Sequence, residues 1–322
     1  MTRSPGPADE VERGLLQALQ IDGRVAFSLV ADVLDVSERT VERRYRELRA
    51  AGAVRVVGKT WPSAVDEQQW LVRVGCVPDA AEGLAHAVAR LPETSWVQLT
   101  SGGAELLTMV RVPAGDDQPS GSVLSRLPRS PRVTRVDGLS VLAVFAGGRI
   151  SPLTKAGPLP DEAVRRIADA ALPDDGQRCR PTDDDAALLA ALEVDGRARW
   201  RDLATTTGRS PTTVRRRVAE LVRGQALVFD VDFAPSLLGL RSSAALWLSV
   251  HPSDLLAAGE ALAGHPEVGF AAATTGATNL YASVQLRDDR ALFEYLTGPV
   301  TTLPGLIAIH TAPVLRTVKR TA

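Results

Sequence analysis

The segment LLQALQIDGRVAFSLVADVLDVSERTVERRYRELRAAGA, residues 15–53, returns without a gap as LLAALEVDGRARWRDLATTTGRSPTTVRRRVAELVRGQA, residues 188–226. The two segments are offset by 173 residues and share sixteen identical positions. Chance pairing seldom keeps one register over this length, so the repeat indicates that one functional unit was duplicated and fused. The identical residues, numbered in the first copy, are Leu15, Leu16, Ala18, Leu19, Asp22, Gly23, Arg24, Ala31, Ser37, Thr40, Val41, Arg43, Arg44, Glu47, Leu48 and Ala53.

Each copy predicts three helices in a helix-turn-helix arrangement. In the first copy, apolar residues at helical spacing end at Asp22-Gly23, and a second helix is predicted over 28–34. Ser37 is placed to cap the third helix, 38–50, which is expected to bury one apolar face. That face consists of Val41, Tyr45 and Leu48. The second copy has the matching helix over 201–206, a turn at Gly208, the cap Ser210 and the apolar residues Val214, Val218 and Leu221.

A different pattern follows each helical unit, after short β-prone runs at 54–57 and 227–231. Its order is βαββαβ, the arrangement of ferredoxin-like domains. We therefore predict an α+β protein in which two winged or three-helix helix-turn-helix domains alternate with two ferredoxin-like βαββαβ domains. The predicted elements are 70–77, 80–91, 96–101, 105–112, 122–127 and 133–145 in the first half, and 244–250, 253–263, 267–275, 279–286, 289–297 and 305–318, broken near Pro313, in the second.

These patterns divide the chain into five segments. A chain of 322 residues exceeds what one hydrophobic core usually serves, which agrees with several domains. The predicted boundaries are 9–60 and 183–238 for the helix-turn-helix domains, 66–146 and 241–320 for the βαββαβ domains, and 147–182 for a linker with a short helix over 161–172.

The composition is that of an ordinary globular protein, with 45% hydrophobic and 23% charged residues. The net charge of -1 argues against coating nucleic acid by bulk electrostatics and leaves local basic surfaces open. No apolar run is long enough to span a membrane, and residues 1–10 lack the apolar core of a signal peptide. Cys76 and Cys179 show no metal or redox spacing. We expect a cytoplasmic protein.

Specific residues carry a family resemblance. Together with the domain order, they make the chain resemble the Lrp/AsnC (leucine-responsive/asparagine regulator) family of bacterial transcription factors. The resemblance covers nearly the whole chain twice, and it is looser in the first half, where Gly102-Gly103 and Glu105 stand for Gly276-Ala277 and Asn279. Most family members carry a single copy. The matching residues are Leu189, Leu192, Asp195-Gly196-Arg197, Leu203-Ala204, Ser210, Val214, Arg217 and Leu221, then Thr274-Thr275-Gly276, Asn279-Leu280, Leu303-Pro304-Gly305 and Thr311.

We expect double-stranded DNA to bind the outer faces of the two third helices. Arginine contacts guanine or phosphate, and serine and threonine hydroxyls serve either role. Glu38, Glu42 and Glu47 accompany five arginines in the first helix, and only Glu220 accompanies four in the second, so we expect the second unit to bind more strongly. A solvated arginine-rich surface is the alternative. The candidate contacts are Ser37, Arg39, Thr40, Arg43, Arg44, Arg46, Ser210, Thr212, Thr213, Arg215, Arg216 and Arg217.

The resemblance also implies a small effector, an amino acid or related carboxylate, at the turn between the second and third strands of each βαββαβ domain. Glycine lets a ligand approach the backbone, and exposed amides can hold a carboxylate. The family more often has an acidic residue where Asn279 stands, and a neutral amide weakens the grip on an ammonium group. The alternative is a tight turn in which glycine only supplies a positive φ. The candidate residues are Thr274, Thr275, Gly276, Ala277 and Asn279, and in the first domain Ser101, Gly102, Gly103 and Glu105.

Catalysis has little support in the sequence. His86, His251, His265 and His310 are scattered without metal spacing, and no phosphate loop or nucleophile motif is present. We therefore predict no metal, cofactor or catalytic residue. One enzyme class stays as an alternative, since siroheme decarboxylases resemble the same family. They need histidine and basic residues that line a pocket for tetrapyrrole carboxylates, and His310, on a predicted sheet strand, is the candidate histidine. A further alternative is an assembly module that has lost DNA binding.

The duplication itself predicts an arrangement. Each βαββαβ sheet has one face covered by helices, so its other face, with Trp247 or its strand neighbours in the second domain, must be buried against another layer. Single-copy relatives stack domains from two chains. Here we expect the two halves of one chain to form an intrachain pseudo-dimer, with pairing between chains as the rival arrangement and further homo-oligomers open in either case.

Overall fold

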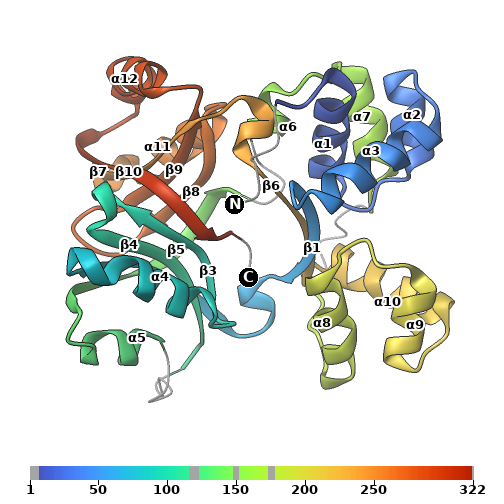
Figure 1. The fold of residues 1–322 in the computed structure, drawn as a ribbon, viewed down its shortest axis with the longest axis horizontal. Helices are drawn as coiled ribbons and strands as arrows, with labels where there is room; N and C mark the ends of the chain where they lie inside the picture. Colours follow the sequence, from blue (N-terminus) through green and yellow to red (C-terminus); the bar gives the residue numbers. More distant parts are fainter. Residues whose placement is uncertain (1–6, 116–122, 148–151, 173–177, 321–322) are drawn as a thin grey trace. The chain divides into compact units, whose positions relative to one another are not determined.

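The computed structural model describes residues 7–115, 123–147, 152–172 and 178–320. The chain forms two compact units, each made from two separate stretches of sequence (Figure 1). Unit 1 is Met1–Val65 with Ser151–Gly239 and holds both helix-turn-helix domains; unit 2 is Asp66–Ile150 with Leu240–Ala322 and holds both βαββαβ domains. The repeat therefore brings equivalent domains together. Within the described residues, no helix is both long and apolar enough to cross a membrane.

The first helix-turn-helix domain consists of α1 (Glu10–Ile21), α2 (Phe27–Leu34) and α3 (Glu38–Ala50). α1 starts in a capping box, because Asp9 and Glu12 each accept a hydrogen bond from the other's backbone N–H. Asp35 ends α2 in the left-handed region at φ 52°. The predicted apolar face of α3 is confirmed, since its three residues are buried.

The second helix-turn-helix domain consists of α8 (Ala186–Val194), α9 (Trp200–Thr207) and α10 (Pro211–Arg223). Gly208 ends α9 at φ 65°, a left-handed conformation that glycine adopts without steric cost. The predicted turn and the buried face of α10 are both confirmed.

A two-stranded ribbon joins the two helix-turn-helix domains. It pairs β1 (Val54–Thr60) with β6 (Leu227–Phe233) in antiparallel register. The central pair is Val57 with Asp230, and these residues are also equivalent in the sequence repeat. The ribbon is therefore centred on a pseudo-two-fold axis that relates one domain to the other. The sequence predicted both strands but not their pairing.

The segment predicted as a linker is built into the first helix-turn-helix domain. It contains α7 (Asp161–Ala170), as predicted although two residues shorter, and a further helix α6 (Pro152–Ala156) that was not predicted. Residues 148–151 and 173–177 of the predicted linker lie outside the described residues. Leu153 and Ile167 are buried in the same core as α1, α2 and α3. The helix pair is thus a structural part of this domain, because it covers apolar surface that three helices leave exposed.

Unit 2 contains the predicted βαββαβ order twice. The predicted helix over 122–127 is a single turn, α5, and Ser122 lies outside the described residues. The first domain consists of β2 (Glu67–Cys76), α4 (Ala81–Ala89), β3 (Thr94–Thr100), β4 (Glu105–Pro113), α5 (Val123–Arg126) and β5 (Val133–Ala146). The second consists of β7 (Ser242–Val250), α11 (Leu255–Gly264), β8 (Val268–Thr274), β9 (Leu280–Leu286), α12 (Asp289–Thr297) and β10 (Leu306–Lys319).

The eight strands close into one barrel in the order β10-β3-β4-β2-β5-β8-β9-β7 (Figure 1). The closing pairs are β5 with β8 and β10 with β3, one from each domain. The inner faces share a core in which Leu71 and Met109 of the first domain meet Trp247 and Tyr281 of the second. The expected intrachain pseudo-dimer of the βαββαβ domains is therefore confirmed.

Pro313 does not break the last strand, contrary to the prediction. β10 runs through it, pairing with β7 up to Pro313 and with β3 from Val314 onward. Proline lacks the N–H that a ladder requires, and it sits where the strand changes partners. β5 behaves in the same way, so that Ala146 of the first domain lies in the helix-side core of the second.

Candidate nucleic-acid interface and effector turns

Both third helices start with the same serine cap. Ser37 Oγ accepts a hydrogen bond from Thr40 N at 3.1 Å, and Ser210 Oγ accepts one from Thr213 N at 3.1 Å. In each helix the serine and threonine hydroxyls also bond each other at 2.8 Å. These predicted DNA contacts thus also stabilise the helices, because their hydrogen bonds fix the first turn and keep its hydroxyl groups at the exposed helix N-terminus.

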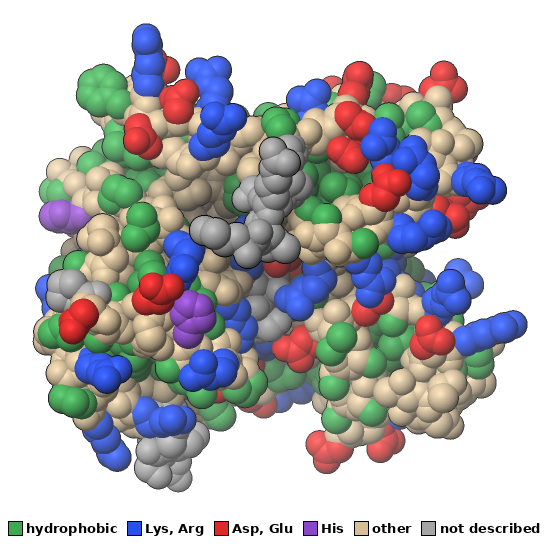
Figure 2. Space-filling view, in the orientation of Figure 1, with side chains coloured by type: hydrophobic (Ala, Val, Ile, Leu, Met, Phe, Trp, Pro, Cys, Tyr) green, Lys and Arg blue, Asp and Glu red, His purple; other side chains and the backbone are tan. Residues whose placement is uncertain are grey.

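The outer faces of α3 and α10 carry exposed basic side chains. Figure 2 shows Lys and Arg side chains gathered over this part of unit 1. Arg43 bonds Glu47 at 3.0 Å, and Arg216 lies 3.5 Å from Glu220, so each of these two arginines pairs with a glutamate one turn further along its helix. The other exposed predicted contacts are Arg39 and Arg46 on α3, and Thr212 and Arg215 on α10.

Arg44 and Arg217 lie elsewhere than the other predicted DNA contacts. Arg44 turns back to the start of α1, where it bonds Asp9 at 2.7 Å and lies 3.4 Å from Glu12. Arg217 bonds Asp185 at 2.7 Å. The two arginines are equivalent in the repeat and tie each third helix to the start of its own domain's first helix. Their guanidinium groups therefore already have partners within their own domains.

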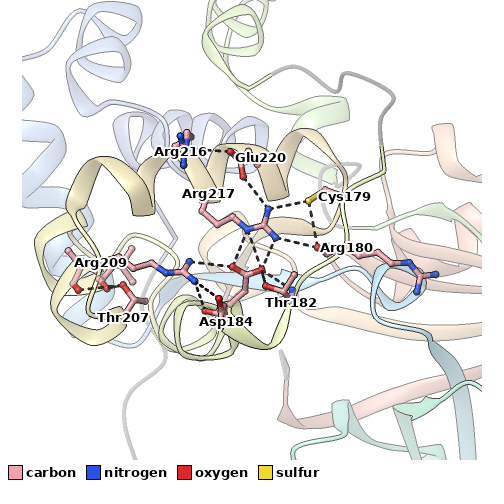
Figure 3. A network of polar contacts seen from close by, with 12 residues as sticks. Cys179, Arg180, Thr182, Asp184, Thr207, Arg209, Arg216, Arg217 and Glu220 are labelled. Carbon is pink, nitrogen blue, oxygen red and sulfur yellow. Dashed lines mark hydrogen bonds and ion pairs between the residues drawn. The ribbon is translucent and has the colours of Figure 1, made fainter.

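Asp185 is the central acceptor of this network. Its side chain is 1% exposed and receives hydrogen bonds from Arg217 and from Thr182. Burial alone raises the pKa of a carboxyl group, but these bonds outweigh it and lower the pKa of Asp185 to about 2. Arg217 also approaches the Cys179 sulfur at 3.6 Å (Figure 3). The second domain is thus held by a buried ion pair, where the first has a more exposed one.

A reciprocal arginine contact was missed by the sequence analysis. Arg24 donates to the backbone carbonyls of Gly196 and Ala198, and Arg197 donates to those of Gly23 and Val25. Burial, followed by the charge of Arg197, lowers the pKa of Arg24 to about 10. The available signal was Asp-Gly-Arg in both copies, each followed three residues later by an aromatic residue.

In the second candidate effector turn, the polar side chains are already hydrogen-bonded within the protein. Both atoms of the Asn279 amide bond Val250: Oδ1 accepts from its N–H at 2.9 Å, and Nδ2 donates to its carbonyl at 2.8 Å. Thr275 exchanges two hydrogen bonds with Ser140 of β5. Thr274 is buried, and its hydroxyl donates to the carbonyl of Thr278. These side chains hold the turn, which leaves its exposed backbone as the part open to a ligand.

Glycine at this turn is required by packing as well as by conformation. Gly276 has φ 111°, and a Cβ atom there would lie 2.5 Å from Leu139 Cδ2 of β5. Ala277, the next residue, is exposed. At Gly276 the close approach is therefore made by the first domain's own strand.

The first effector turn is more open. Gly102 has φ 71°, and a methyl group on its Cα would meet no other atom within 4 Å; Gly103 has φ 88°. Ser101 Oγ donates to Glu105 at 2.9 Å, and Arg73 bonds the same carboxylate at 2.9 Å. The acidic residue that the family more often has at the position of Asn279 is thus present in the first domain as Glu105. Arg73 partly balances its charge.

The histidines lie apart. His86 and His251 are exposed, and His265 bonds the Tyr295 hydroxyl at 2.9 Å. His310 pairs with Trp247 across β10 and β7 and is exposed. Among the residues the structure describes, no group of three or more His, Cys, Asp or Glu side chains is placed to hold a metal ion.

Comparison with known proteins agrees with this architecture. The AsnC-type helix-turn-helix domain matches residues 9–49 and 182–222, and the Lrp/AsnC ligand binding domain matches residues 243–322. The Bkd operon transcriptional regulator of Pseudomonas aeruginosa is 31% identical over 140 residues, which are 42% of this chain and 90% of that protein. The HTH-type transcriptional regulator FL11 of Pyrococcus horikoshii is 27% identical over 138 residues, 42% of this chain and 91% of that protein.

One solved structure is similar over nearly the full length. The siroheme decarboxylase NirDL covers 98% of this chain and 93% of its own, with a TM-score of 0.63 and 13% sequence identity. At this identity the likeness shows a shared duplicated fold and nothing about activity. The sequence matches place the chain in a class of helix-turn-helix proteins with a ligand-binding domain. It belongs to the Lrp/AsnC family, in a tandem-duplicated form with two AsnC-type helix-turn-helix domains.

Proposed function

We propose that the protein is a sequence-specific DNA-binding transcriptional regulator. The observation that carries this proposal is the pair of serine-capped third helices, each with exposed arginines, held within one compact unit. A recognition helix needs a buried back face and hydrogen-bonding side chains on its front, and α3 and α10 have both. α10 contributes more to affinity, because its first turn has no acidic residue whereas that of α3 has Glu38.

The test is binding to a duplex from the protein's own promoter region, measured by fluorescence anisotropy at several salt concentrations. Phosphate contacts make affinity fall steeply with salt. Replacing Arg215 and Arg216 by alanine should weaken binding at least tenfold, which is far more than Glu42→Ala should weaken it. Arg166→Ala, an exposed arginine of α7, is the control and should bind as wild type. Absence of sequence-selective binding below micromolar protein would reject the proposal.

We infer further that a small carboxylate effector acts on the regulatory domains. Support comes from the match to the Lrp/AsnC ligand binding domain and from the exposed turn backbone at Ala277 and Ala104. A ligand that binds only the folded state raises the unfolding temperature. A thermal-shift screen of amino acids and related carboxylates should therefore find a stabiliser. Ala277→Trp and Ala104→Trp place bulk on one turn each, and the variant that loses the shift identifies the turn used.

The second candidate is an enzyme resembling the siroheme decarboxylases. Its support is the likeness to NirDL along almost the whole chain. Against it, His310 is exposed, and Arg73, whose guanidinium lies over the Trp247 ring, is already bonded to Glu105. Addition of an iron tetrapyrrole to the purified chain distinguishes the two candidates. A saturable Soret shift that is lost in His310→Ala would favour the enzyme.

A further inference from the structure

The two recognition helices differ in charge at equivalent positions although their frames are the same. The cap and its threonine recur in both helices, as does the arginine that follows, Arg43 in one and Arg216 in the other. Several positions on the outer surface have diverged. At the offset of 173 residues, Arg39 corresponds to Thr212, Glu42 to Arg215, and Arg46 to Ala219.

The central difference is a charge reversal. Glu42 and Arg215 are both exposed, and neither forms an ion pair within the part of the chain that the structure describes. The next residue along each helix behaves differently, because Arg43 and Arg216 each have a glutamate partner one turn ahead. Glu42 and Arg215 are therefore available to an outside partner, and they offer it opposite chemistry.

The pseudo-two-fold symmetry of unit 1 makes the positions of Glu42 and Arg215 equivalent in space. The ribbon is centred on Val57 and Asp230, and Arg24 and Arg197 make reciprocal contacts across the same pseudo-two-fold axis. A duplex that meets both recognition helices of one chain meets them in pseudo-symmetric orientations, as a palindromic site meets a symmetric dimer. The base pair next to Glu42 in one half-site is then equivalent to the base pair next to Arg215 in the other.

The side chains at this position select different bases. Arginine donates two hydrogen bonds to guanine O6 and N7, whereas a glutamate carboxylate accepts from cytosine N4. We propose that one chain recognises an asymmetric duplex, in which the half-site under α10 has guanine where the half-site under α3 has cytosine. This inference rests on the proposed DNA-binding function and adds the form of the operator. A single-copy relative with identical helices has no means to make this distinction.

The experiment is selection of bound sequences from a random duplex pool by the full chain, with bases counted in each half-site. Wild type should enrich an imperfect palindrome with one inverted base pair. Glu42→Arg should make that position guanine in both half-sites, and Arg215→Glu should make it cytosine in both. Each variant should bind its own symmetric site at least fivefold tighter than the wild-type site, since one mismatched base pair costs about 1–3 kcal/mol, which is about fivefold to 150-fold. Arg166→Ala should select the wild-type site.

The possible results separate this inference from the proposed function. A perfectly palindromic wild-type site, or enrichment of one half-site alone, overturns the asymmetric operator while DNA recognition stands. If Glu42→Arg tightens binding to every sequence equally, Glu42 only repels phosphate, and the base assignment is wrong. If no sequence is enriched, the proposed sequence-specific function fails together with this inference. Circular dichroism melting of each variant confirms that a loss of selection is not a loss of fold.

Discussion

Arg24 and Arg197 each bind the loop that carries the other. The guanidinium of Arg197 donates to Gly23 O at 2.8 Å and to Val25 O at 2.9 Å, and Arg24 makes the equivalent pair of contacts in return. Each arginine also stacks on an aromatic ring of the opposite domain. Arg24 lies 3.9 Å from the Trp200 ring centroid, and Arg197 lies 4.2 Å from that of Phe27. Planar, five-donor side chains suit such a contact, which lysine does not reproduce.

Removal of either arginine should destabilise unit 1. Arg24→Ala and Arg197→Ala each leave two partly buried backbone carbonyls without a donor, which costs about 2–3 kcal/mol. Urea unfolding followed by circular dichroism measures the loss. Arg24→Lys should recover less than half of it, and Arg13→Ala, an exposed arginine on α1, should change nothing. Wild-type stability in both alanine variants would mean that the ribbon alone holds the two domains.

The ion pair of Asp185 should give a defined acid dependence. Its pKa in the folded protein is about 2, below the ordinary value of 3.8, so its contribution is fully present above the ordinary value and is lost as pH falls toward 2. Asp185→Asn should be less stable than wild type by about 2 kcal/mol at pH 7, and the difference should shrink below about pH 4. Asp184→Asn is the control, because that side chain is 86% exposed. A difference that is constant with pH would contradict this account.

Changing Asn279 to the acidic residue that the family more often has should lower the stability of the protein. In Asn279→Asp the donor to Val250 O is replaced by a carboxylate oxygen, which repels that carbonyl. We expect a loss of about 2 kcal/mol at neutral pH, measured by thermal unfolding. The reverse change at the equivalent position of the first domain, Glu105→Gln, breaks a partly exposed ion pair with Arg73 and should cost less than about 1 kcal/mol. Equal costs would show that the two turns are held in the same way.

The two turn glycines should respond unequally to alanine. Gly102 has open space around it, so the only strain in Gly102→Ala comes from the left-handed backbone. We expect a loss of stability of about 1 kcal/mol. Gly276→Ala also forces a methyl group against Leu139 and should cost about 2 kcal/mol or more. Combining Gly276→Ala with Leu139→Ala tests the cause, since it removes the clash. If the double variant recovers none of the loss attributed to the clash, backbone strain is the whole effect.

Local patterns in the sequence were sufficient to predict most elements. The serine caps and the apolar spacing of α3 and α10 are local signals, and the structure places both helices as predicted. The repeat also predicted that the two βαββαβ domains pair within one chain, because an uncovered sheet face needs a partner. The features that depend on local sequence patterns or on the duplication could therefore be predicted from the sequence.

Contacts between distant residues could not be predicted in the same way. Nothing near Arg44 or Arg217 indicates that these arginines turn toward acids that lie 32 residues earlier in the chain. Nor does the composition around Ile167 show that a glycine- and proline-rich connection enters a core. The Asn279 amide was assigned to a ligand because family position was known and its partner Val250 was not. These cases share one cause, which is that tertiary partners decide how a polar side chain is used.

The barrel of unit 2 has a consequence for how this protein coexists with its relatives. Each βαββαβ domain supplies its last strand to the other, so both sheet edges that a second chain would join are already paired. A single-copy relative therefore finds no unpaired strand edge in this barrel, and mixed pairing through these edges is disfavoured. The fused chain also always presents its two unequal halves in a ratio of one to one.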